Sequence, residues 1–257
     1  MRLRVFVAGF ALLGCRPLHP SVRKEAIAPR ELRLWTTRAI ATVLTEVGAE
    51  FERTSGYRLR VTSDLPAGFA RRAARGEPFD LLISGSATVD EWTRAGRVAA
   101  MSRVTLARSG IGVAVRAGAR KPGLHSIDAF RRAILDAKSI AYLRVGSGLY
   151  LDSLFDRVDL SRTVAAKATR PDGDSVAILV ARGEIELGLV VITQILTTPG
   201  AELAGPLPAP LQSYVTFVAA LSADAAEPDA ARQLIRFLQG PVAARVITAQ
   251  GMERPPF

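Results

Sequence analysis

The chain has very little cysteine and histidine. Its 257 residues include one cysteine, Cys15, and two histidines, His19 and His125. One cysteine excludes an internal disulfide bond, and without any Cys-x-x-Cys pair a zinc site is not expected. After the first fifteen residues, no uncharged apolar segment approaches the roughly 20 residues that a membrane-spanning helix needs. The sequence therefore predicts a protein without a metal, a cofactor or a transmembrane helix in its main part.

Aromatic residues are also scarce, at 6% of the chain, although the formal net charge is +10. Nucleic-acid-binding surfaces interleave aromatic rings with basic groups, whereas here the arginines are spread along helical patterns. We therefore predict no nucleic-acid partner and interpret the basic residues as solvated helix faces. The positive charge still favours an anionic ligand over a cationic one.

The motifs of common catalytic sites are missing as well. Gly146-Ser147-Gly148 lacks the Gly-x-Ser-x-Gly spacing of a nucleophile elbow, and there is no phosphate-binding Gly-x-x-x-x-Gly-Lys loop or metal-binding His-Glu-x-x-His pair. Acid–base chemistry would therefore depend on carboxylates that pair across a cleft, for which the candidates are Asp80, Asp90, Asp172 and Asp174. We predict that the protein is not an enzyme. A secreted α/β enzyme acting on a small anionic substrate is the alternative.

The chain does have a distinctive start. Arg2 and Arg4 precede an uncharged apolar run, Val5–Leu13, and the sequence Leu-Leu-Gly-Cys ends at Cys15. A basic start, a short apolar core and a small residue before a cleavage point describe a secretory signal. Leu-Leu-Gly-Cys also resembles the lipobox of bacterial lipoproteins, in which the cysteine carries lipid. We expect residues 1–15 to be a signal peptide with a lipobox, and the alternative is an ordinary signal cleaved nearby.

The rest of the chain alternates between strand and helix patterns. Residues 16–30 carry three prolines with charges between them, which predicts a tether. Residues 102–115 form a long alternating stretch broken at Ser109-Gly110, and residues 203–210 are proline-rich. Such an alternation predicts α/β architecture with a parallel sheet. We expect strands at 32–35, 58–62, 79–83, 139–143, 164–168, 187–192 and 214–221, and helices at 40–51, 69–75, 89–95, 127–137, 149–158, 176–182, 228–238 and 242–250.

Three stretches, in this order along the chain, resemble the bacterial periplasmic solute-binding proteins of the molybdate-binding type. Phe69–Ser84 looks like the helix, the Gly-x-Pro turn and the Asp-opened strand of that family. Leu179–Val190 contains a Val-Ala-Arg-Gly-Glu segment, and Phe237–Glu253 looks like the closing helix and the final Gly-Met-Glu. The resemblance runs from Glu31 to the end of the chain.

The resemblance implies a fold of two α/β lobes with a ligand cleft between them and two crossing segments. Carried over, lobe one is 31–109 plus 214–257 and lobe two is 110–213. The lobes are expected to close on the ligand by a hinge motion.

The same resemblance implies a function. The expected protein is a monomer in the periplasm or cell envelope that hands a small anion to the membrane permease of an ABC importer, with lipid on Cys15 holding it on a membrane surface. The ligand-sensing domain of a transcription regulator shares this fold. Such a regulator would need a helix-turn-helix segment, for which residues 1–30 leave no room.

Strand-to-helix junctions are the expected ligand site, because ligands of open α/β sheets bind beyond the carboxyl ends of the strands. Helix N-termini there offer free N–H groups to an anion. Four junctions qualify: 36–38, 64–68, 146–149 and 173–175. Simple helix capping explains each junction alone about as well. The residues predicted to contact ligand are Thr36, Thr37, Arg38, Ser147, Gly148, Asp174 and Ser175.

The chain departs from molybdate binders at the residues that hold the oxyanion. The family places a serine at the first junction, where this chain has Thr37 or Arg38, and Ser-Gly at the second, where it has Pro66-Ala67. Val191 stands where the family has a tyrosine. Arginine presents a planar fork that pairs with a carboxylate through two hydrogen bonds, and Arg144 is a second such group. Both an organic carboxylate and a molybdate- or tungstate-like oxyanion therefore remain as candidate ligands.

Overall fold

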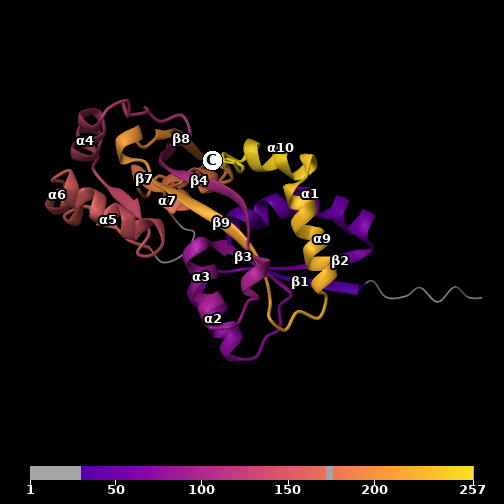
Figure 1. Cartoon of the computed structure of the whole chain (residues 1–257). Coiled ribbons are helices and arrows are strands. Elements are labelled where there is room, and N and C mark those ends of the chain that lie inside the picture. Colours follow the sequence, from indigo (N-terminus) through magenta and orange to yellow (C-terminus); the bar gives the residue numbers. More distant parts are fainter. Residues whose placement is uncertain (1–29, 172–175, 257) are drawn as a thin grey trace, which may run out of the picture.

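The computed structural model describes residues 30–171 and 176–256 (Figure 1). Cys15, the expected signal peptide, Asp174 and Ser175 lie outside these residues. The first half of the chain forms these elements: β1 (Arg30–Thr36), α1 (Arg38–Ser55), β2 (Tyr57–Ser63), α2 (Pro66–Ala74), β3 (Leu81–Gly85), α3 (Ser86–Arg94), β4 (Val104–Arg116) and α4 (Ile127–Asp136).

The second half continues the α/β pattern and ends in two helices. Its elements are β5 (Ile140–Tyr142), α5 (Ser147–Arg157), α6 (Ser161–Ala165), β6 (Ala168–Thr169), α7 (Val176–Ala181), β7 (Leu187–Val191), α8 (Ile192–Leu196), β8 (Ala201–Pro206), β9 (Tyr214–Leu221), α9 (Pro228–Gln239) and α10 (Pro241–Ala249). Short 3₁₀ turns lie at Ala100–Ser102 and Ala209–Leu211.

The strands of the described residues form one mixed sheet in the order β2-β1-β3-β9-β4-β7-β5-β6, with β8 also paired to β4. β1 is parallel to β2 and β3, and β5 is parallel to β6 and β7. β9 and β4 run antiparallel to their neighbours. The expectation of a parallel sheet is therefore correct for each outer part and wrong for the middle.

The fold has two lobes, as expected, and β4 passes from one to the other. Residues 104–110 of β4 pair with β9, and residues 111–116 pair with β7 and β8. Figure 1 shows α1, α9 and α10 on one side of the molecule, and α4, α5 and α6 at the opposite end. Ser109-Gly110 lies within β4 and does not break it, because both residues pair with β9.

Each lobe has its own apolar cores. In lobe one, α1, α9 and α10 bury their apolar residues against one face of the sheet, around Phe51 and Leu234. A second cluster on the other face gathers the aromatic rings of Trp35, Phe69, Phe79 and Trp92. The cores of lobe two draw only on residues 111–211 for their fully buried members.

Helix α1 illustrates why most elements follow the sequence pattern. Its buried residues recur at three- and four-residue spacing from Ala39 to Phe51, which places them on one face. The helix ends at Gly56, whose φ of 75° is the left-handed conformation that glycine adopts without strain. The N–H of Gly56 donates to the carbonyl of Glu52 and closes the last turn.

Three elements differ from the expectation, and one of them is helix α8 (Ile192–Leu196), which the sequence pattern did not predict. Residues 161–165 form helix α6, not a strand over 164–168, and only Ala168–Thr169 pair as β6. A short apolar run such as Val164-Ala165-Ala166 does not distinguish helix from strand. The proline-rich stretch contains strand β8, which pairs with β4 across a β-bulge and ends at Pro206.

Candidate ligand-binding site

The carboxyl ends of β1, β2 and β3 meet in one row. Thr36 is in register with Ser63 of β2 and with Ile83 of β3. The N–H of Thr37 donates to the carbonyl of Ile83 over 3.2 Å, and the N–H of Asp64 donates to the carbonyl of Thr36 over 3.1 Å. The starts of α1, α2 and α3 are therefore neighbours, at the edge where open α/β sheets bind ligands.

Helix α1 starts without a side-chain cap. Thr37 occupies the N-cap position, but its hydroxyl does not cap the helix, contrary to the expectation for a threonine there. The Thr37 Oγ1 is buried and has no hydrogen-bond partner within the described residues. Thr36 is fully buried, and its hydroxyl donates to the carbonyl of Thr37. The Thr36 hydroxyl is therefore used within the turn, while the Thr37 hydroxyl remains free to bind a ligand.

Arg38 begins α1 and is half-buried. Among the described residues its guanidinium has no hydrogen bond and no ion pair, and the first turn of α1 contains no acidic residue. Other half-buried arginines of lobe one behave differently, because Arg33 pairs with Asp80 and Arg72 pairs with Asp64 and Glu77. Arg38 and the free N–H groups of α1 thus place uncompensated positive charge at the strand ends.

Helix α2 starts under a carboxylate of the protein itself. Asp64 Oδ1 accepts the N–H of Leu65 at 2.8 Å, and Asp64 Oδ2 accepts from Arg72 Nε at 3.2 Å. A Cβ on Gly68 would lie 1.9 Å from Asp64 Oδ1, so the carboxylate lies directly against the first turn. This junction, one of the four predicted for the ligand, already holds an anion.

Helix α3 starts at a Ser-Gly-Ser sequence that the sequence pattern did not single out. Ser84 ends the buried part of β3 and is fully buried, and its hydroxyl has no partner within the described residues. Gly85 is the N-cap residue and provides no side chain, and the first turn has no acidic residue. The only signal available in the sequence was a small polar tripeptide directly before a helix.

In lobe two, α5 starts at the predicted Gly146-Ser147-Gly148 turn. Gly146 has a φ of 61°, and a Cβ on Gly148 would lie 1.7 Å from the carbonyl oxygen of Leu143. Both positions therefore require glycine. Ser147 is almost fully buried at the first helical position, and the first turn has no acidic residue. The N–H groups of Gly148 and Leu149 already donate to the carbonyls of Val145 and Gly146, each over 3.2 Å, so Ser147 is the predicted residue of this turn that still offers donors to an anion.

A hydrogen-bonded cluster of charged side chains lies next to this turn in the sequence and includes Arg144, two residues before Gly146. Arg144 Nη2 donates to the carbonyl of Arg170 over 3.2 Å. Arg170 Nη2 donates to Asp152 Oδ2 over 2.7 Å, and Tyr142 Oη donates to Asp152 Oδ1 over 2.9 Å. Burial and the hydrogen bond to Asp152 raise the pKa of Tyr142 to about 12. Asp152 therefore fixes the position of the Arg170 side chain. The hydrogen bond from Arg144 to the Arg170 carbonyl connects the two loops.

Further side chains lie where the lobes join. Val191, which replaces the tyrosine of molybdate binders, ends β7 and is buried. Two residues later, Thr193 is the second residue of α8, and its backbone N–H donates to Ser109 Oγ of β4 over 3.3 Å. The Thr193 hydroxyl is buried and has no partner in the part of the chain that the structure describes.

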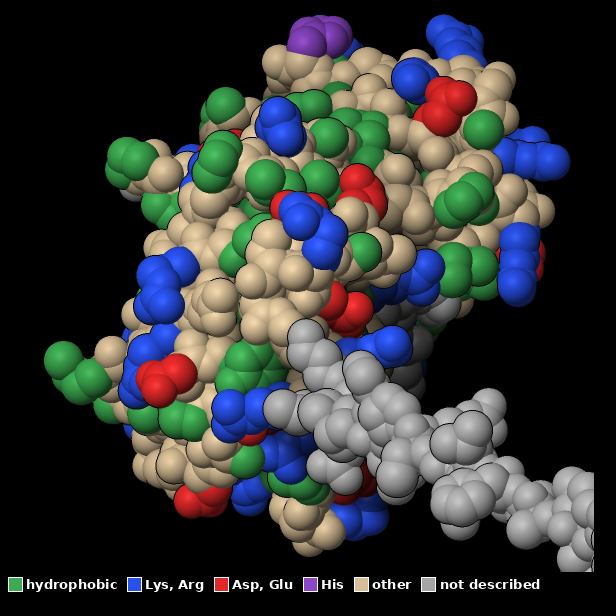
Figure 2. All heavy atoms as spheres, turned by 90° about the vertical axis from the view of Figure 1, so that its right-hand side faces the viewer, with side chains coloured by type: hydrophobic (Ala, Val, Ile, Leu, Met, Phe, Trp, Pro, Cys, Tyr) green, Lys and Arg blue, Asp and Glu red, His purple; other side chains and the backbone are tan. Residues whose placement is uncertain are grey.

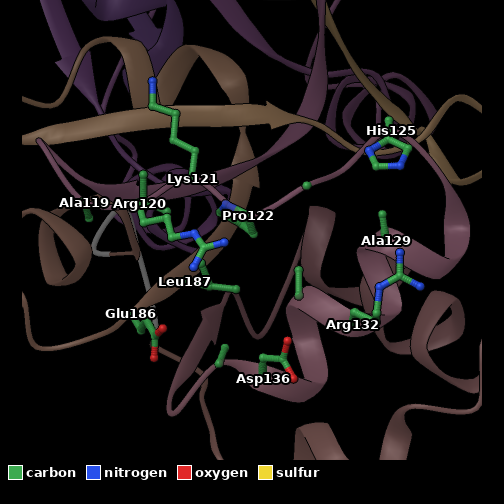
Figure 3. A pocket seen from close by; sticks show the side chains of 14 residues that line it. Ala119, Arg120, Lys121, Pro122, His125, Ala129, Arg132, Asp136, Glu186 and Leu187 are labelled. Atoms are coloured by element: carbon green, nitrogen blue, oxygen red, sulfur yellow. The ribbon is translucent and has the colours of Figure 1, made fainter.

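A cavity of about 490 Å³ lies elsewhere, between α4 and the loop of residues 119–123 (Figure 3). Figure 3 shows Arg120 extending into this space while Lys121 points away from it. The cavity also adjoins Val115 near the end of β4 and Leu187 at the start of β7, so it lies at the opposite edge of lobe two from the carboxyl ends of β5 and β7. Its charged side chains are of both signs and are exposed, and it is not part of the predicted site.

Figure 2 shows one face of the protein with its side chains coloured by type. Lys and Arg side chains are scattered over that face and alternate with Asp and Glu. Within residues 30–171 and 176–256 no group of three metal-ligating side chains occurs. Nor is any helix in these ranges long and apolar enough to span a membrane.

Comparisons with known proteins agree with this architecture. Residues 32–253 match the family model of the bacterial extracellular solute-binding proteins. An aconitate isomerase from a Pseudomonas species is 32% identical over 261 aligned residues, which cover 99% of this chain and 98% of that protein.

Solved structures share the fold at lower identity. The periplasmic molybdate-binding protein of Azotobacter vinelandii superposes with a TM-score of 0.73 at 21% identity, covering 88% of this chain and 100% of the other. PEB3 of Campylobacter jejuni, solved with L-phospholactate bound, superposes with a TM-score of 0.67 at 14% identity, covering 87% of this chain and 100% of the other.

Proposed function

The chain belongs to the bacterial extracellular solute-binding proteins, and from this premise we propose that it captures a small organic acid with several carboxylates. The ligand binds between lobe one, residues 31–109 plus 214–257, and lobe two, residues 110–213. The protein then delivers it to the permease of an ABC importer. The full-length similarity to an aconitate isomerase supports a ligand of the aconitate type, which is a tricarboxylate.

Arg38 is the observation that carries this proposal. It is a half-buried guanidinium at the start of α1, and no described group neutralises it. A guanidinium fork matches the two oxygens of a carboxylate, and the N–H groups of α1 and the hydroxyl of Thr37 add donors at the same edge. From lobe two, Ser147 faces the ligand as a donor, and Gly148 lets the ligand approach the backbone of the turn. Asp174 and Ser175 belong to the same proposed site.

The occupied start of α2 favours a carboxylate over an oxyanion such as molybdate. An oxyanion held by neutral donors uses several helix starts, and the Asp64 carboxylate already accepts the N–H of the α2 N-cap residue Leu65 and lies against Gly68 in the first turn. A second negative charge there would be repelled by the Asp64 carboxylate. A carboxylate paired with Arg38 avoids that position.

The members of this family are extracellular, so we place the protein outside the cytoplasm. We also propose that lipid on Cys15 anchors it to the membrane surface. Mass spectrometry of the mature N-terminus tests the anchor. An acylated cysteine supports it, and a mature chain starting after Cys15 contradicts it.

Replacing Arg38 tests the binding function. Isothermal titration with trans-aconitate should give tight binding by the unaltered protein and a loss of about 2–4 kcal/mol in Arg38→Ala, because the ligand carboxylate stays desolvated without its partner. Arg245→Ala, which removes an exposed arginine of α10 without a hydrogen bond or ion pair in the described residues, is the matched control and should bind normally. Tight molybdate binding by Arg38→Ala, together with no response to any carboxylate, would contradict the proposal.

Isomerisation of aconitate is a second candidate function, because the relative that matches along the whole chain carries that activity in its name. A proton shift between the methylene and alkene carbons would need a side chain that removes and returns the proton. Asp64 is the carboxylate nearest the junctions in the described residues, and it is already paired with Arg72. Proton NMR of cis-aconitate incubated with the protein decides between capture alone and turnover.

A further inference from the structure

The start of α3 has the properties of a second anion site on lobe one. Residues alternate between faces along a strand, and Leu82 packs with Trp35 and Trp92 on the face that α2 and α3 cover. Ser84 shares that face and directly precedes the N-cap residue of α3. Its hydroxyl is fully buried and unpartnered in the described residues, whereas buried hydroxyls are almost always hydrogen-bonded.

The space beside this junction is open. A Cβ built on Gly85 would meet nothing within 4 Å, in contrast to Gly68 and Gly148, where it would collide with the protein. The N-cap residue has no side chain that could occupy the free N–H groups of α3. An unpartnered hydroxyl, free N–H groups and open space thus coincide at one helix start.

Three other helix starts of the protein, in contrast, are already satisfied. Asp64 occupies the start of α2, and Asp80 accepts the N–H groups of Ala226 and Glu227 before α9. Ser126 caps α4 by accepting the N–H of Ala129. Where β1, β2 and β3 end, the starts of α1 and α3 have no acidic side chain that accepts their N–H groups.

These two starts lie side by side. β1 and β3 are hydrogen-bonded neighbours, and the N–H of Thr37 donates to the carbonyl of Ile83, the residue before Ser84. Adjacent strands are about 4.7–4.9 Å apart. Carboxylates separated by two or three carbon atoms can therefore reach both starts from one ligand.

We propose that Ser84, Gly85 and Ser86 form a second carboxylate subsite beside Arg38, so that lobe one binds two carboxylates of one ligand and α5 of lobe two receives a third. The inference rests on the proposed binding function and defines its ligand class as a tricarboxylate. It assigns Ser84 and Ser86 the selection of polycarboxylates over monocarboxylates.

Calorimetric titration with a matched series of saturated acids tests this subsite. Butyrate carries one carboxylate, glutarate two, and propane-1,2,3-tricarboxylate three, and none has a double bond to isomerise. Ser84→Ala should weaken glutarate and the tricarboxylate by about five- to tenfold, as for one neutral hydrogen bond, and leave butyrate unchanged. Because Ser84 Oγ is unpartnered in the described structure, the melting temperature of the free variant should stay the same or rise.

A second variant keeps the test independent of Ser84. Ser86→Asp places a negative charge at the first position of α3 and should weaken the di- and tricarboxylate more than tenfold. Ile127→Asp makes the same change at the first position of α4 and should bind all three acids normally.

The outcomes separate the inference from the function on which it rests. If the unaltered protein binds none of the carboxylates, the binding function is wrong and the subsite with it. If Arg38→Ala loses binding while Ser84→Ala and Ser86→Asp keep normal affinities, carboxylates bind without α3 and the subsite alone is wrong. Equal weakening of all three acids, with a lowered melting temperature, assigns Ser84 a structural role and also contradicts the subsite.

Discussion

Buried acidic residues of lobe one are used for the fold. Asp80 is fully buried and accepts hydrogen bonds from the backbone N–H and guanidinium of Arg33 and from the N–H of Ala226. It precedes β3, so it lies at the edge of the sheet opposite the proposed site. Asp80 therefore does not act on a ligand, although its residue type alone made it a candidate for acid–base work.

Removing the Asp80 carboxylate should destabilise the protein strongly. Asp80→Ala leaves a half-buried guanidinium and the backbone N–H groups of Arg33, Ala226 and Glu227 without their acceptor, and breaking such a buried pair costs about 3–5 kcal/mol. Asp229→Ala, which removes the exposed partner of Arg232, should change the free energy of unfolding by less than about 1 kcal/mol. Urea unfolding at pH 7 measures both, and equal effects would contradict the role assigned to Asp80.

The same pair predicts a pH dependence. Burial alone would raise the pKa of Asp80, but the Arg33 guanidinium and the backbone N–H groups outweigh it and hold the pKa below its usual value. The resulting stabilisation is present above the unfolded-state pKa, about 3.9, and is lost as the pH falls through the lower folded-state value. In urea titrations below pH 4, the stability difference between the unaltered protein and Asp80→Ala should shrink.

The site was predictable from the sequence only where a residue type alone signals its role. Arg38 and the glycines around Ser147 were proposed from the sequence because arginine and Gly-x-Gly turns at a helix start favour an anion. Ser84 was missed because a serine at the end of a buried strand looks like any strand end. The carboxylate of Asp64 over α2 could not be foreseen, since it depends on how the side chain folds back onto Gly68.

At the scale of elements, long periodic segments were predicted well and short ones poorly. α1, α4, α9 and α10 were located from their apolar spacing, and the cap at Ser126 is confirmed. α6 and β8 were missed because each is only five or six residues long and takes its conformation from partners distant in sequence. For β8, that partner is β4 across a bulge.

The turn from β5 into α5 should tolerate no side chain. In Gly148→Ala the new Cβ would lie 1.7 Å from the Leu143 carbonyl oxygen, so the backbone of the turn must shift. We expect a loss of about 1–3 kcal/mol, as for overpacking, together with weaker ligand binding. Gly48 lies inside α1, and a Cβ there would meet Leu59 of β2 at 3.4 Å, an ordinary contact. Gly48→Ala should therefore leave the free energy of unfolding nearly unchanged or raise it. Thermal melts and titrations of both variants check this, and a Gly148→Ala protein with normal stability would contradict the geometry.

At the scale of the whole molecule, three motifs were enough to predict the family and the two-lobed fold, and both are confirmed. The mixed character of the sheet was not predicted, because the direction of β4 and β9 depends on how the chain passes between lobes. The side chain of Gln212 stabilises β4 where it passes between the lobes: its Oε1 accepts the N–H of Ile111, and its Nε2 donates to the Ile111 carbonyl.

Ligand binding should bring the lobes together by bending at this passage. Small-angle scattering is expected to show a small decrease in the radius of gyration on saturation with propane-1,2,3-tricarboxylate. Arg38→Ala at the same ligand concentration should show no decrease. An unchanged radius of the unaltered protein at saturation would contradict a hinge motion.

The passage of β9 back into lobe one also determines the order in which the protein can fold as its chain emerges, N-terminus first, outside the cytoplasm. The main core of lobe one combines residues 32–107 with residues 217–252, so it cannot close until nearly the whole chain has emerged. The buried members of the lobe-two cores are all present once residue 211 has emerged. Lobe two is therefore complete first, and the apolar faces of α1 and β1 must wait for α9 and α10. During that interval the N-terminal half of the chain is the part that needs protection from aggregation.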